Sequence, residues 1–326
     1  MQFQKLCSIS NKTISSYSER LLVMHVPMSD SKKPYLISAG ETLGVIGAGV
    51  MGRTLLHGLF DSGTISREQA WASAKSRSSC DAASEELGIP VVTDCRSRVS
   101  QSGLILVCVK PKQAASVAGT LKEAGLRPDT LLISIMAGTT IAQLESALGT
   151  RNPWIRAMPN TPCIVREGIT VICAGTHASA DHMARAQRVF EAVGKCLPAE
   201  ESYFNAITAL SGSGPAYQYL IMEAFADAGV RVGLPRQLAL ILVAQTAVGA
   251  ARMVLTTGRH PAALRDDVTT PAGCTIGGLL MLEDGKIRSV LARAIEEATK
   301  IAGNLGSGSM PEKEKPAMRA PDSNSQ

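Results

Sequence analysis

The sequence predicts an α/β domain followed by an all-α domain, and three observations predict it. Short apolar segments alternate with helix-like segments between residues 42 and 200, which is typical of a parallel sheet covered by helices on both faces. The segment GLILVCV is apolar throughout, as expected of a strand buried on both sides. Strand patterns stop after residue 200, and residues 203–305 read as long helices broken by Gly and Pro turns.

The expected elements follow in chain order. Helices are expected near residues 50–62 and 78–88, and strands in TLGVIG, QAWASA, PVVT, GLILVCV, TLLISIM, WIRAMP and GITVICAG. Longer helices follow, separated by GSGP, GLP, GRHP and TTPAG. The chain therefore divides into a disordered or targeting extension (1–41), an α/β domain (42–200), a helical domain (201–305) and a disordered tail (306–326).

Composition excludes several classes of protein. The net charge of +5 is spread along the chain, and no basic run is interleaved with aromatic residues, so we expect no nucleic-acid partner. The eight cysteines form no C-x-x-C pair and lie at no metal-ligand spacing from the five histidines, so we expect free thiols and no metal site. Free thiols are typical of a reducing compartment.

Two segments bear on location. Residues 1–41 contain no apolar core of a secretory signal, and we expect a cytoplasmic protein; a mitochondrial address stays open because Lys5, Lys12 and Arg20 alternate with hydroxyl residues. Residues 238–255 approach the length of a membrane-spanning helix but contain Gln245 and Arg252. We expect this helix to be buried at a domain or subunit interface, without a membrane.

A dinucleotide fingerprint follows the first strand. The segment GVIGAGVMG has the G-x-G-x-x-G spacing directly between an apolar strand and an apolar-periodic helix, which is the context the motif requires. The glycines allow a tight turn, a close backbone approach to a pyrophosphate and close helix packing, while the helix N-terminus faces the phosphates. A Gly-rich structural turn is the alternative. The predicted cofactor residues are Gly47, Ala48, Gly49, Val50, Met51 and Gly52.

The end of the second strand distinguishes between the two nicotinamide cofactors. An NAD site usually has an acidic residue there, whereas this chain has Ser73, Lys75 and Arg77 and no carboxylate before Asp81. Hydroxyls and cations suit a ribose 2′-phosphate, so we expect NADPH, with NADH left open and solvated surface charges as the alternative. Further loops at strand ends add Val109, Lys110, Pro111, Ala137, Gly138 and Asn160.

A second motif lies in the helical half. The stretch DVTTPAGCTIGG is a hydroxyl- and Gly-rich turn that leads into a helix. Free N–H groups at such a helix start form an anion site that would fit a small carboxylate, and a Thr hydroxyl beside them could bind a substrate nitrogen. An ordinary capping turn is the alternative. The candidate substrate-binding residues are Thr270, Gly273, Cys274 and Thr275.

These motifs together resemble the pyrroline-5-carboxylate reductase family over residues 42–305. The most specific segments are MPNTP, LSGSGPAY, GLPR and HPAALRDDVTTPAGCTIGGLLMLEDG, in unbroken order. The resemblance implies a Rossmann-type domain, a helical domain that interlocks in a homodimer, and assembly into larger rings such as a decamer. It implies an active site between one subunit's nicotinamide and the turn of its dimer mate, with Thr275 as the catalytic residue that binds the imine nitrogen and residues 273–275 holding the substrate carboxylate.

The activity implied is NADPH-dependent hydride transfer to the imine carbon of 1-pyrroline-5-carboxylate, which gives L-proline in the last step of its biosynthesis. Ala272 stands where the family pattern has glycine and would be strained at positive φ. One rival is a β-hydroxyacid-type dehydrogenase, disfavoured because GPAYQYLIMEAFADAG lacks the Lys such enzymes use. The other is a non-catalytic dinucleotide-sensing protein, disfavoured because Thr275 is intact.

Overall fold

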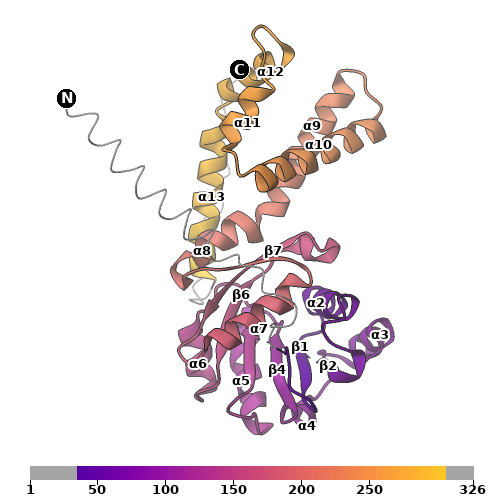
Figure 1. Ribbon diagram of the computed structural model, residues 1–326, viewed down its shortest axis with the longest axis vertical. Coiled ribbons are helices and arrows are strands. Elements are labelled where there is room, and N and C mark those ends of the chain that lie inside the picture. The colour runs from indigo at the N-terminus through magenta and orange to yellow at the C-terminus, as the bar shows by residue number, and fades with distance from the viewer. Residues whose placement is uncertain (1–34, 306–326) are drawn as a thin grey trace, which may run out of the picture. The chain divides into compact units, whose positions relative to one another are not determined.

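The computed structural model describes residues 35–305 (Figure 1). The expected tail (306–326) and most of the expected extension lie outside the described residues. Where the extension is described, it does not match the expectation: Leu36 and Ile37 are 3% and 8% exposed and pack with the sheet. The folded domain therefore begins before residue 42, because two apolar side chains in this segment are buried.

An eight-stranded sheet forms the first half of the described chain, in the order β3-β2-β1-β4-β5-β6-β7-β8. This is the Rossmann-type arrangement, with β1 and β4 adjacent at the point where the strand order reverses. The strands are β1 (Thr42–Ile46), β2 (Ala70–Ser73), β3 (Val91–Val92), β4 (Ser102–Val107), β5 (Leu131–Ser134), β6 (Trp154–Met158), β7 (Gly168–Ala174) and β8 (Gly194–Pro198).

Two features of the sheet differ from the sequence prediction. β7 runs antiparallel to β6, whereas a parallel sheet was expected throughout. A short connection through the 3-10 helix η4 (Thr161–Val165) joins β6 to β7, and it is too short for a parallel crossover. β8 was not predicted, because only Cys196 of this edge strand is buried and its sequence GKCLP shows no apolar alternation.

Helices cover both faces of the sheet, as predicted. Side chains of β4 alternate between the two sides, with Leu104 and Leu106 in one core and Ile105 and Val107 in the other. The first core is closed by α2 (Val50–Asp61), α3 (Arg77–Leu87) and α7 (Ala180–Glu191), and the second by α4 (Arg96–Val99), α5 (Ala114–Glu123) and α6 (Ile141–Leu148).

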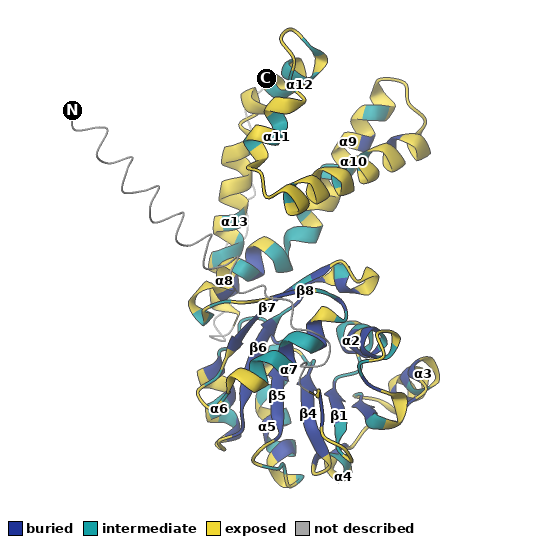
Figure 2. Cartoon of the chain, viewed as in Figure 1, coloured by how far each residue is buried: buried dark blue, intermediate teal, exposed yellow. Residues whose placement is uncertain are grey.

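The second half is helical, as predicted, and most of its surface is exposed (Figure 2). In the described chain α9 buries only Ala226, α10 only Ala239 and α13 only Ala302. The elements are η5 (Glu201–Tyr203), α8 (Phe204–Ile207), the π-helical turn η6 (Thr208–Gly212), α9 (Gly214–Arg231), α10 (Arg236–Thr257), α11 (Pro261–Asp267), α12 (Cys274–Asp284) and α13 (Ile287–Asn304).

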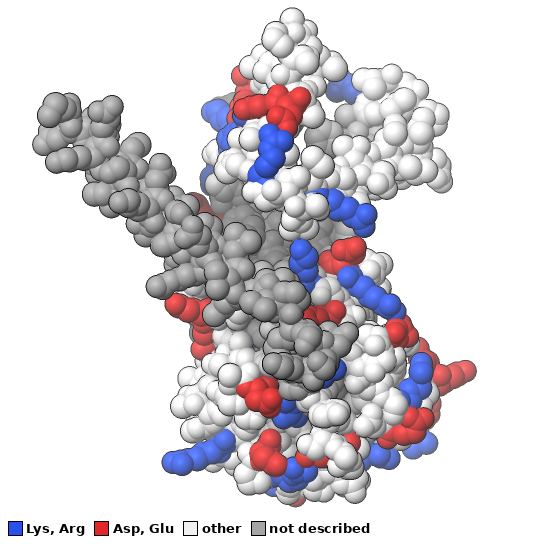
Figure 3. All heavy atoms as spheres, in the orientation of Figure 1, with Lys and Arg blue, Asp and Glu red and all other residues white. Residues whose placement is uncertain are grey.

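Helix α10 is strongly apolar but largely exposed in the single chain. It is long and apolar enough to cross a membrane by length and composition, yet 6% of its most apolar window is buried in the single chain. Leu240, Ile241 and Leu242 are 46%, 63% and 48% exposed. Few charged side chains lie over α9 and α10 on the face shown in Figure 3. An uncovered apolar surface of this kind indicates an interaction surface.

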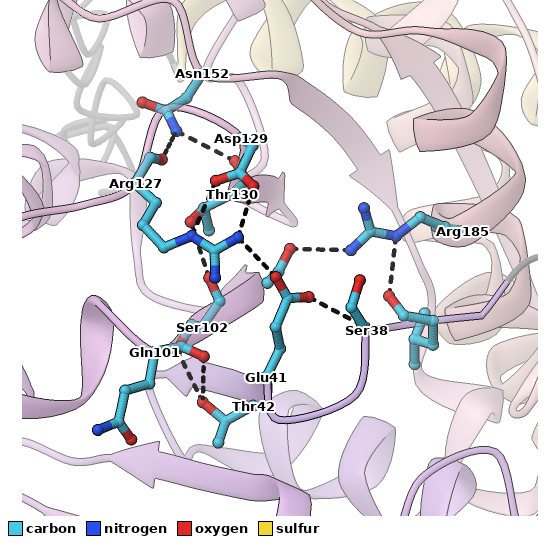
Figure 4. Close-up of polar contacts among 12 residues, drawn as sticks. Ser38, Glu41, Thr42, Gln101, Ser102, Arg127, Asp129, Thr130, Asn152 and Arg185 are labelled. Carbon is cyan, nitrogen blue, oxygen red and sulfur yellow. Dashed lines mark hydrogen bonds and ion pairs between the residues drawn. The ribbon is translucent and has the colours of Figure 1, made fainter.

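A polar cluster secures the amino edge of the sheet, where β1, β4 and β5 begin (Figure 4). Arg127 Nη2 donates to Glu41 Oε1 at 2.7 Å and to Asp129 Oδ2 at 2.6 Å. Arg185 of α7 donates to the backbone oxygens of Leu36 and Gly103, both at 2.9 Å. Burial alone would raise the pKa of Glu41, but the Ser38 N–H and the Arg127 guanidinium lower it. The cluster fixes the incoming chain at the edge opposite the strand ends that carry the fingerprint.

Candidate active site

The turn between β1 and α2 has the geometry that a dinucleotide requires. Gly47 has φ +103°, and a Cβ there would lie 2.7 Å from the Cys108 carbonyl oxygen. A Cβ on Gly52 would clash with the Gly47 carbonyl oxygen, so this glycine lets α2 pack on the strand. A Cβ on Gly49 would meet no atom within 4 Å apart from its chain neighbours, which leaves open space where a pyrophosphate would approach. The residues present therefore fit the cofactor.

The turn from Gly47 to Gly49 leads into the N-terminus of α2, whose first N–H groups could bind an anion. The N–H groups of Gly47 and Ala48 both donate to the Ser73 carbonyl oxygen, at 3.0 and 2.8 Å, which fixes the turn on β2. Helix α2 begins after Gly49 without a side-chain cap and without an acidic residue in its first turn. Val50 is 62% exposed, and Met51 packs against the core. The N–H groups at this end of α2 are thus available to phosphate oxygens.

The carboxyl end of β2 carries the groups expected to bind a 2′-phosphate. Ser73 is 7% exposed, and α3 begins at Ser76, whose Oγ accepts from the Ser79 N–H at 3.2 Å. Lys75 is exposed and has no ion pair among the described residues. Arg77 pairs with Asp81 on the same helix at 3.1 Å and is 87% exposed. Both cations therefore remain accessible to a ligand.

Two other predicted loops lie at neighbouring strand ends. The Cys108 N–H donates to the Ile46 carbonyl oxygen at 2.8 Å, and the Ile135 N–H donates to the Val107 carbonyl oxygen at 3.2 Å. These bonds bring the loop of Val109, Lys110 and Pro111 and the loop of Ala137 and Gly138 to the edge that carries the fingerprint turn. Gly138 has φ +74°, and Lys110 is exposed.

Asn160 has a positioning role in the structure. Its side chain is buried, with Nδ2 donating to the Ser211 carbonyl oxygen at 3.1 Å and Oδ1 accepting from the Ile169 N–H at 2.9 Å. The amide thereby joins the loop after β6 to β7 and to the start of the helical half. Contact between this side chain and a cofactor stays a prediction.

The expected substrate turn joins α11 to α12. Ala272 has φ +57°, so this chain places an Ala where the backbone is left-handed, as its departure from the glycine pattern suggested. Gly273 caps α12 without a side-chain hydrogen bond, and a Cβ there would clash with Thr270 Oγ1. Thr275 lies in the first turn of α12 and is half-buried, whereas Cys274 is exposed. The Gly273 N–H donates to the Thr270 carbonyl oxygen at 3.1 Å, which leaves the N–H groups of Cys274 and Thr275 for a small anion.

A bidentate ion pair between Arg259 and Asp267 lies at the start of this turn. Arg259 donates to both carboxylate oxygens of Asp267, at 2.6 and 3.1 Å, and its hydrogen bond lowers the pKa of Asp267. Asp266 pairs with Arg265 at 2.8 Å. Within residues 35–305 no hydrogen bond or ion pair joins the turn to the cofactor loops, so the single chain does not bring the two predicted sites together.

Sequence reasoning missed one polar group near the cofactor loops. Arg156 lies in β6, is 4% exposed at its side chain, and pairs with Glu201 of η5 at 3.0 Å. The only signal was a charged residue inside an otherwise apolar strand, WIRAM, because a buried Arg requires a partner. The identity of the partner was not visible, since Glu201 is 45 residues away.

Comparisons with known proteins find related families for both the α/β half and the helical half of the chain. Residues 201–305 match the family model described as pyrroline-5-carboxylate reductase dimerisation, and residues 42–138 match the model described as NADP oxidoreductase, coenzyme F420-dependent. Pyrroline-5-carboxylate reductase of Schizosaccharomyces pombe is 41% identical over 277 residues, covering 80% of this chain and 98% of that protein. The Arabidopsis thaliana protein of that name is 41% identical over 263 residues, covering 81% and 95%.

Solved structures give the same result. A pyrroline-5-carboxylate reductase from Coxiella burnetii superposes with a TM-score of 0.76 at 34% identity, covering 82% of this chain and 98% of that one. Plasmodium falciparum pyrroline carboxylate reductase with NADP bound gives a TM-score of 0.74 at 31% identity, with the same coverage.

Proposed function

The chain belongs to the pyrroline-5-carboxylate reductase family. We propose which of its residues bind the cofactor and the substrate when 1-pyrroline-5-carboxylate is reduced to L-proline. The protein is an oxidoreductase that reduces a C=N bond with NADPH, in the last step of proline biosynthesis. The observation that carries the proposal is the pair of free helix starts, one at the dinucleotide fingerprint and one beside Thr275.

The α/β half, which we delimit as residues 42–200, would hold the cofactor. Gly47 and Ala48 form the turn that faces the pyrophosphate, and the backbone N–H groups from Gly49 to Gly52 bind it, with Gly49 supplying the open approach. Ser73, Lys75 and Arg77 bind the 2′-phosphate, which favours NADPH over NADH. Bound NADPH supplies the hydride. The loops of Val109, Lys110, Pro111, Ala137 and Gly138 hold the nicotinamide end, and Asn160 holds the loop that faces it.

The helical half, residues 201–305, would hold the substrate. N–H groups of Cys274 and Thr275 bind the carboxylate, with Thr270 and Gly273 forming the turn beside them, and the Thr275 hydroxyl binds the ring nitrogen. The imine nitrogen can be protonated before the hydride arrives, so no strong acid is needed. The structure supports this, since Asp266 and Asp267 are both engaged with arginines. Rate acceleration then comes from placing two rings face to face.

The protein associates with itself through the helical half, where the dimerisation model matches. Because the substrate turn and the cofactor loops share no bond within residues 35–305, we place each active site between one subunit's cofactor loops and its partner's turn. We further propose that the dimers assemble into larger rings such as a decamer. We place the protein in the cytoplasm, without nucleic-acid or membrane partners.

Thr275→Ala tests the proposal. Purified protein should oxidise NADPH, seen as a fall in NADPH absorbance, when 1-pyrroline-5-carboxylate is added. It should not do so with a β-keto acid, the substrate that a β-hydroxyacid-type dehydrogenase would reduce. Removing the hydroxyl should lower kcat by about 10- to 100-fold, because a hydrogen bond to a charged group is lost, while Kd for NADPH stays unchanged.

Thr275→Ser is the matched control, since it keeps the hydroxyl and should retain most of the activity. Turnover with the β-keto acid, or turnover with neither compound, would sink the proposed function. Equal losses of turnover and NADPH affinity in Thr275→Ala would remove Thr275 from the substrate site.

A further inference from the structure

Glu201 joins three elements around the loops expected to hold the nicotinamide. Its Oε1 accepts a hydrogen bond from the Ile141 N–H at 2.7 Å and another from Arg156 Nη1 at 3.0 Å. Ile141 is the first residue of α6, Arg156 lies in β6, and Glu201 itself opens η5 at the start of the helical half. A single oxygen atom therefore ties α6 and β6 to the helices.

The burial of Arg156 makes its ion pair with Glu201 important for stability. The Arg156 side chain is 4% exposed, and its guanidinium lies 4.6 Å from the centre of the Phe204 ring. Phe204 is 1% exposed and begins α8. Exposed ion pairs hold side chains weakly, whereas a buried cation without its partner is strongly disfavoured. Glu201, whose side chain is 33% exposed, is the ion-pair partner that balances the charge of Arg156 between β6 and α8.

Two of the loops expected to face the nicotinamide, those after β5 and β6, end next to these contacts. The Ala137–Gly138 loop runs into α6, which begins at Ile141, and β6 ends at Met158, just before Asn160. Asn160 in turn binds the Ser211 carbonyl oxygen, close to the segment that leads into α9. A displacement of Glu201 would therefore shift the two loops and the base of the helical half together.

We infer that Glu201 is a positioning residue of the reduction. It acts through Arg156 and Ile141, and it sets the loops after β5 and β6 relative to the helical half, through which the partner subunit would dock its substrate turn. The inference rests on the proposed function, since it concerns the alignment of the two rings during hydride transfer. The residues that would hold the pyrophosphate and the 2′-phosphate belong to β1–α2 and β2–α3, away from these contacts, so Glu201 should affect turnover and leave cofactor affinity unaffected.

Glu201→Gln is the first test, in the full-length protein. The amide oxygen can still accept from Ile141, but it no longer balances the Arg156 charge. We expect kcat to fall about tenfold or more, with KM for NADPH within about twofold of wild type. The primary isotope effect on kcat, measured with NADPH deuterated at the transferred C4 hydrogen, should rise because misaligned hydride transfer becomes rate-limiting.

Glu145→Gln is the matched control. Glu145 lies on the same helix α6, and its carboxylate also bridges to a distant segment, through Thr176 at 2.7 and 2.9 Å. Among the described residues its carboxylate forms no hydrogen bond or ion pair with Arg156 or with the Ile141 N–H. This variant should keep the wild-type kcat and isotope effect, even if its melting temperature falls as in Glu201→Gln. A purely structural contribution of Glu201 would make the two variants alike.

The double variant Arg156→Met with Glu201→Gln covers the case in which Glu201→Gln does not fold. It removes the unbalanced cation and keeps the acceptor for Ile141, so folding should recover while kcat stays low and the isotope effect stays raised. Wild-type kcat in the double variant, or identical kinetics for Glu201→Gln and Glu145→Gln, would overturn the inference. Wild-type protein that leaves the imine unreduced would instead overturn the proposed function.

Discussion

Ala272 carries a side chain at a backbone position that favours glycine. Its φ of +57° costs an Ala about 1–2 kcal/mol relative to a glycine. A glycine, however, would also gain about 0.4–1 kcal/mol of unfolded-state freedom. The turn beside Thr275 is therefore held in a conformation that its own sequence disfavours.

Ala272→Gly should raise the free energy of unfolding by about 0.5–1 kcal/mol, the difference between these two effects. Urea titration at one fixed protein concentration would measure it, because association also contributes to stability. The control is Ala82→Gly on the exposed face of α3, where the change should destabilise by about 0.5–1 kcal/mol. Equal destabilisation by the two substitutions would show that the turn is unstrained.

Lys75 and Arg77 should determine the choice between NADPH and NADH. Replacing both with Ala should weaken NADPH binding about tenfold or more, because each cation can form a charge-assisted bond to the 2′-phosphate, and should leave NADH binding unchanged. Fluorescence titration of both cofactors would measure this, with the exposed Lys195→Ala as control. Equal affinities of the wild-type protein for the two cofactors would contradict the 2′-phosphate assignment.

At this scale the sequence predicted backbone requirements better than side-chain partners. The three fingerprint glycines have the separate steric roles that their spacing indicated. The sequence predicted strain at Ala272 only on the condition of a positive φ, and the structure gives this residue a φ of +57°. The Glu201–Arg156 pair and the bonds of Asn160 were not predicted, because they join residues far apart in the chain that only folding brings together.

Among the elements, the β1–α2 turn separates folding from binding most cleanly. Gly49→Ala places a methyl group in open space at φ −79°, so stability should stay within about 0.5 kcal/mol of wild type while NADPH affinity falls about tenfold or more. Gly52→Ala should instead destabilise by about 1–3 kcal/mol, because the methyl group meets the Gly47 carbonyl.

Thermal melts with and without NADPH would measure both effects. The expected pattern is an unchanged melting temperature but a reduced NADPH-induced rise for Gly49→Ala, and a lowered melting temperature for Gly52→Ala. If Gly49→Ala binds NADPH like wild type, the pyrophosphate does not approach this glycine.

The predictability of each element depended on its burial. β1, β4 and β5 are buried on both sides, and their continuous apolar runs made them easy to predict. β8 lies at the sheet edge and was missed, because exposed residues there carry no periodic signal. The direction of β7 was also wrong, since strand patterns show where a strand lies but not which way it runs.

At the scale of the whole molecule, the helical half cannot be understood as a single chain. Helices α9 to α13 leave large apolar side chains exposed, among them Leu220, Ile241 and Met281 at 65%, 63% and 67%. The dimerisation model covers this region, so association would cover what the chain alone does not. The sequence predicted a covered helix at residues 238–255, but its partner surfaces could not be predicted from one chain.

Ile241→Glu should therefore prevent association. A carboxylate buried without a partner at an apolar interface costs several kcal/mol, so the dimer should weaken about 100-fold or more and imine reduction should be lost. Sedimentation velocity over a range of concentrations would measure it. Ala82→Glu, on the exposed face of α3, is the control and should stay associated and active. A fully associated Ile241→Glu protein would place the interface elsewhere.

The cluster of Arg127, Glu41 and Arg185 has a practical consequence for engineering. It anchors residues 36–41 at the amino edge of the sheet, a full strand length from the turns that would receive NADPH. A tag or linker joined directly to Leu36 would thus be attached at the edge of the sheet remote from the dinucleotide crevice. Immobilising the enzyme through that end should leave the cofactor free to exchange.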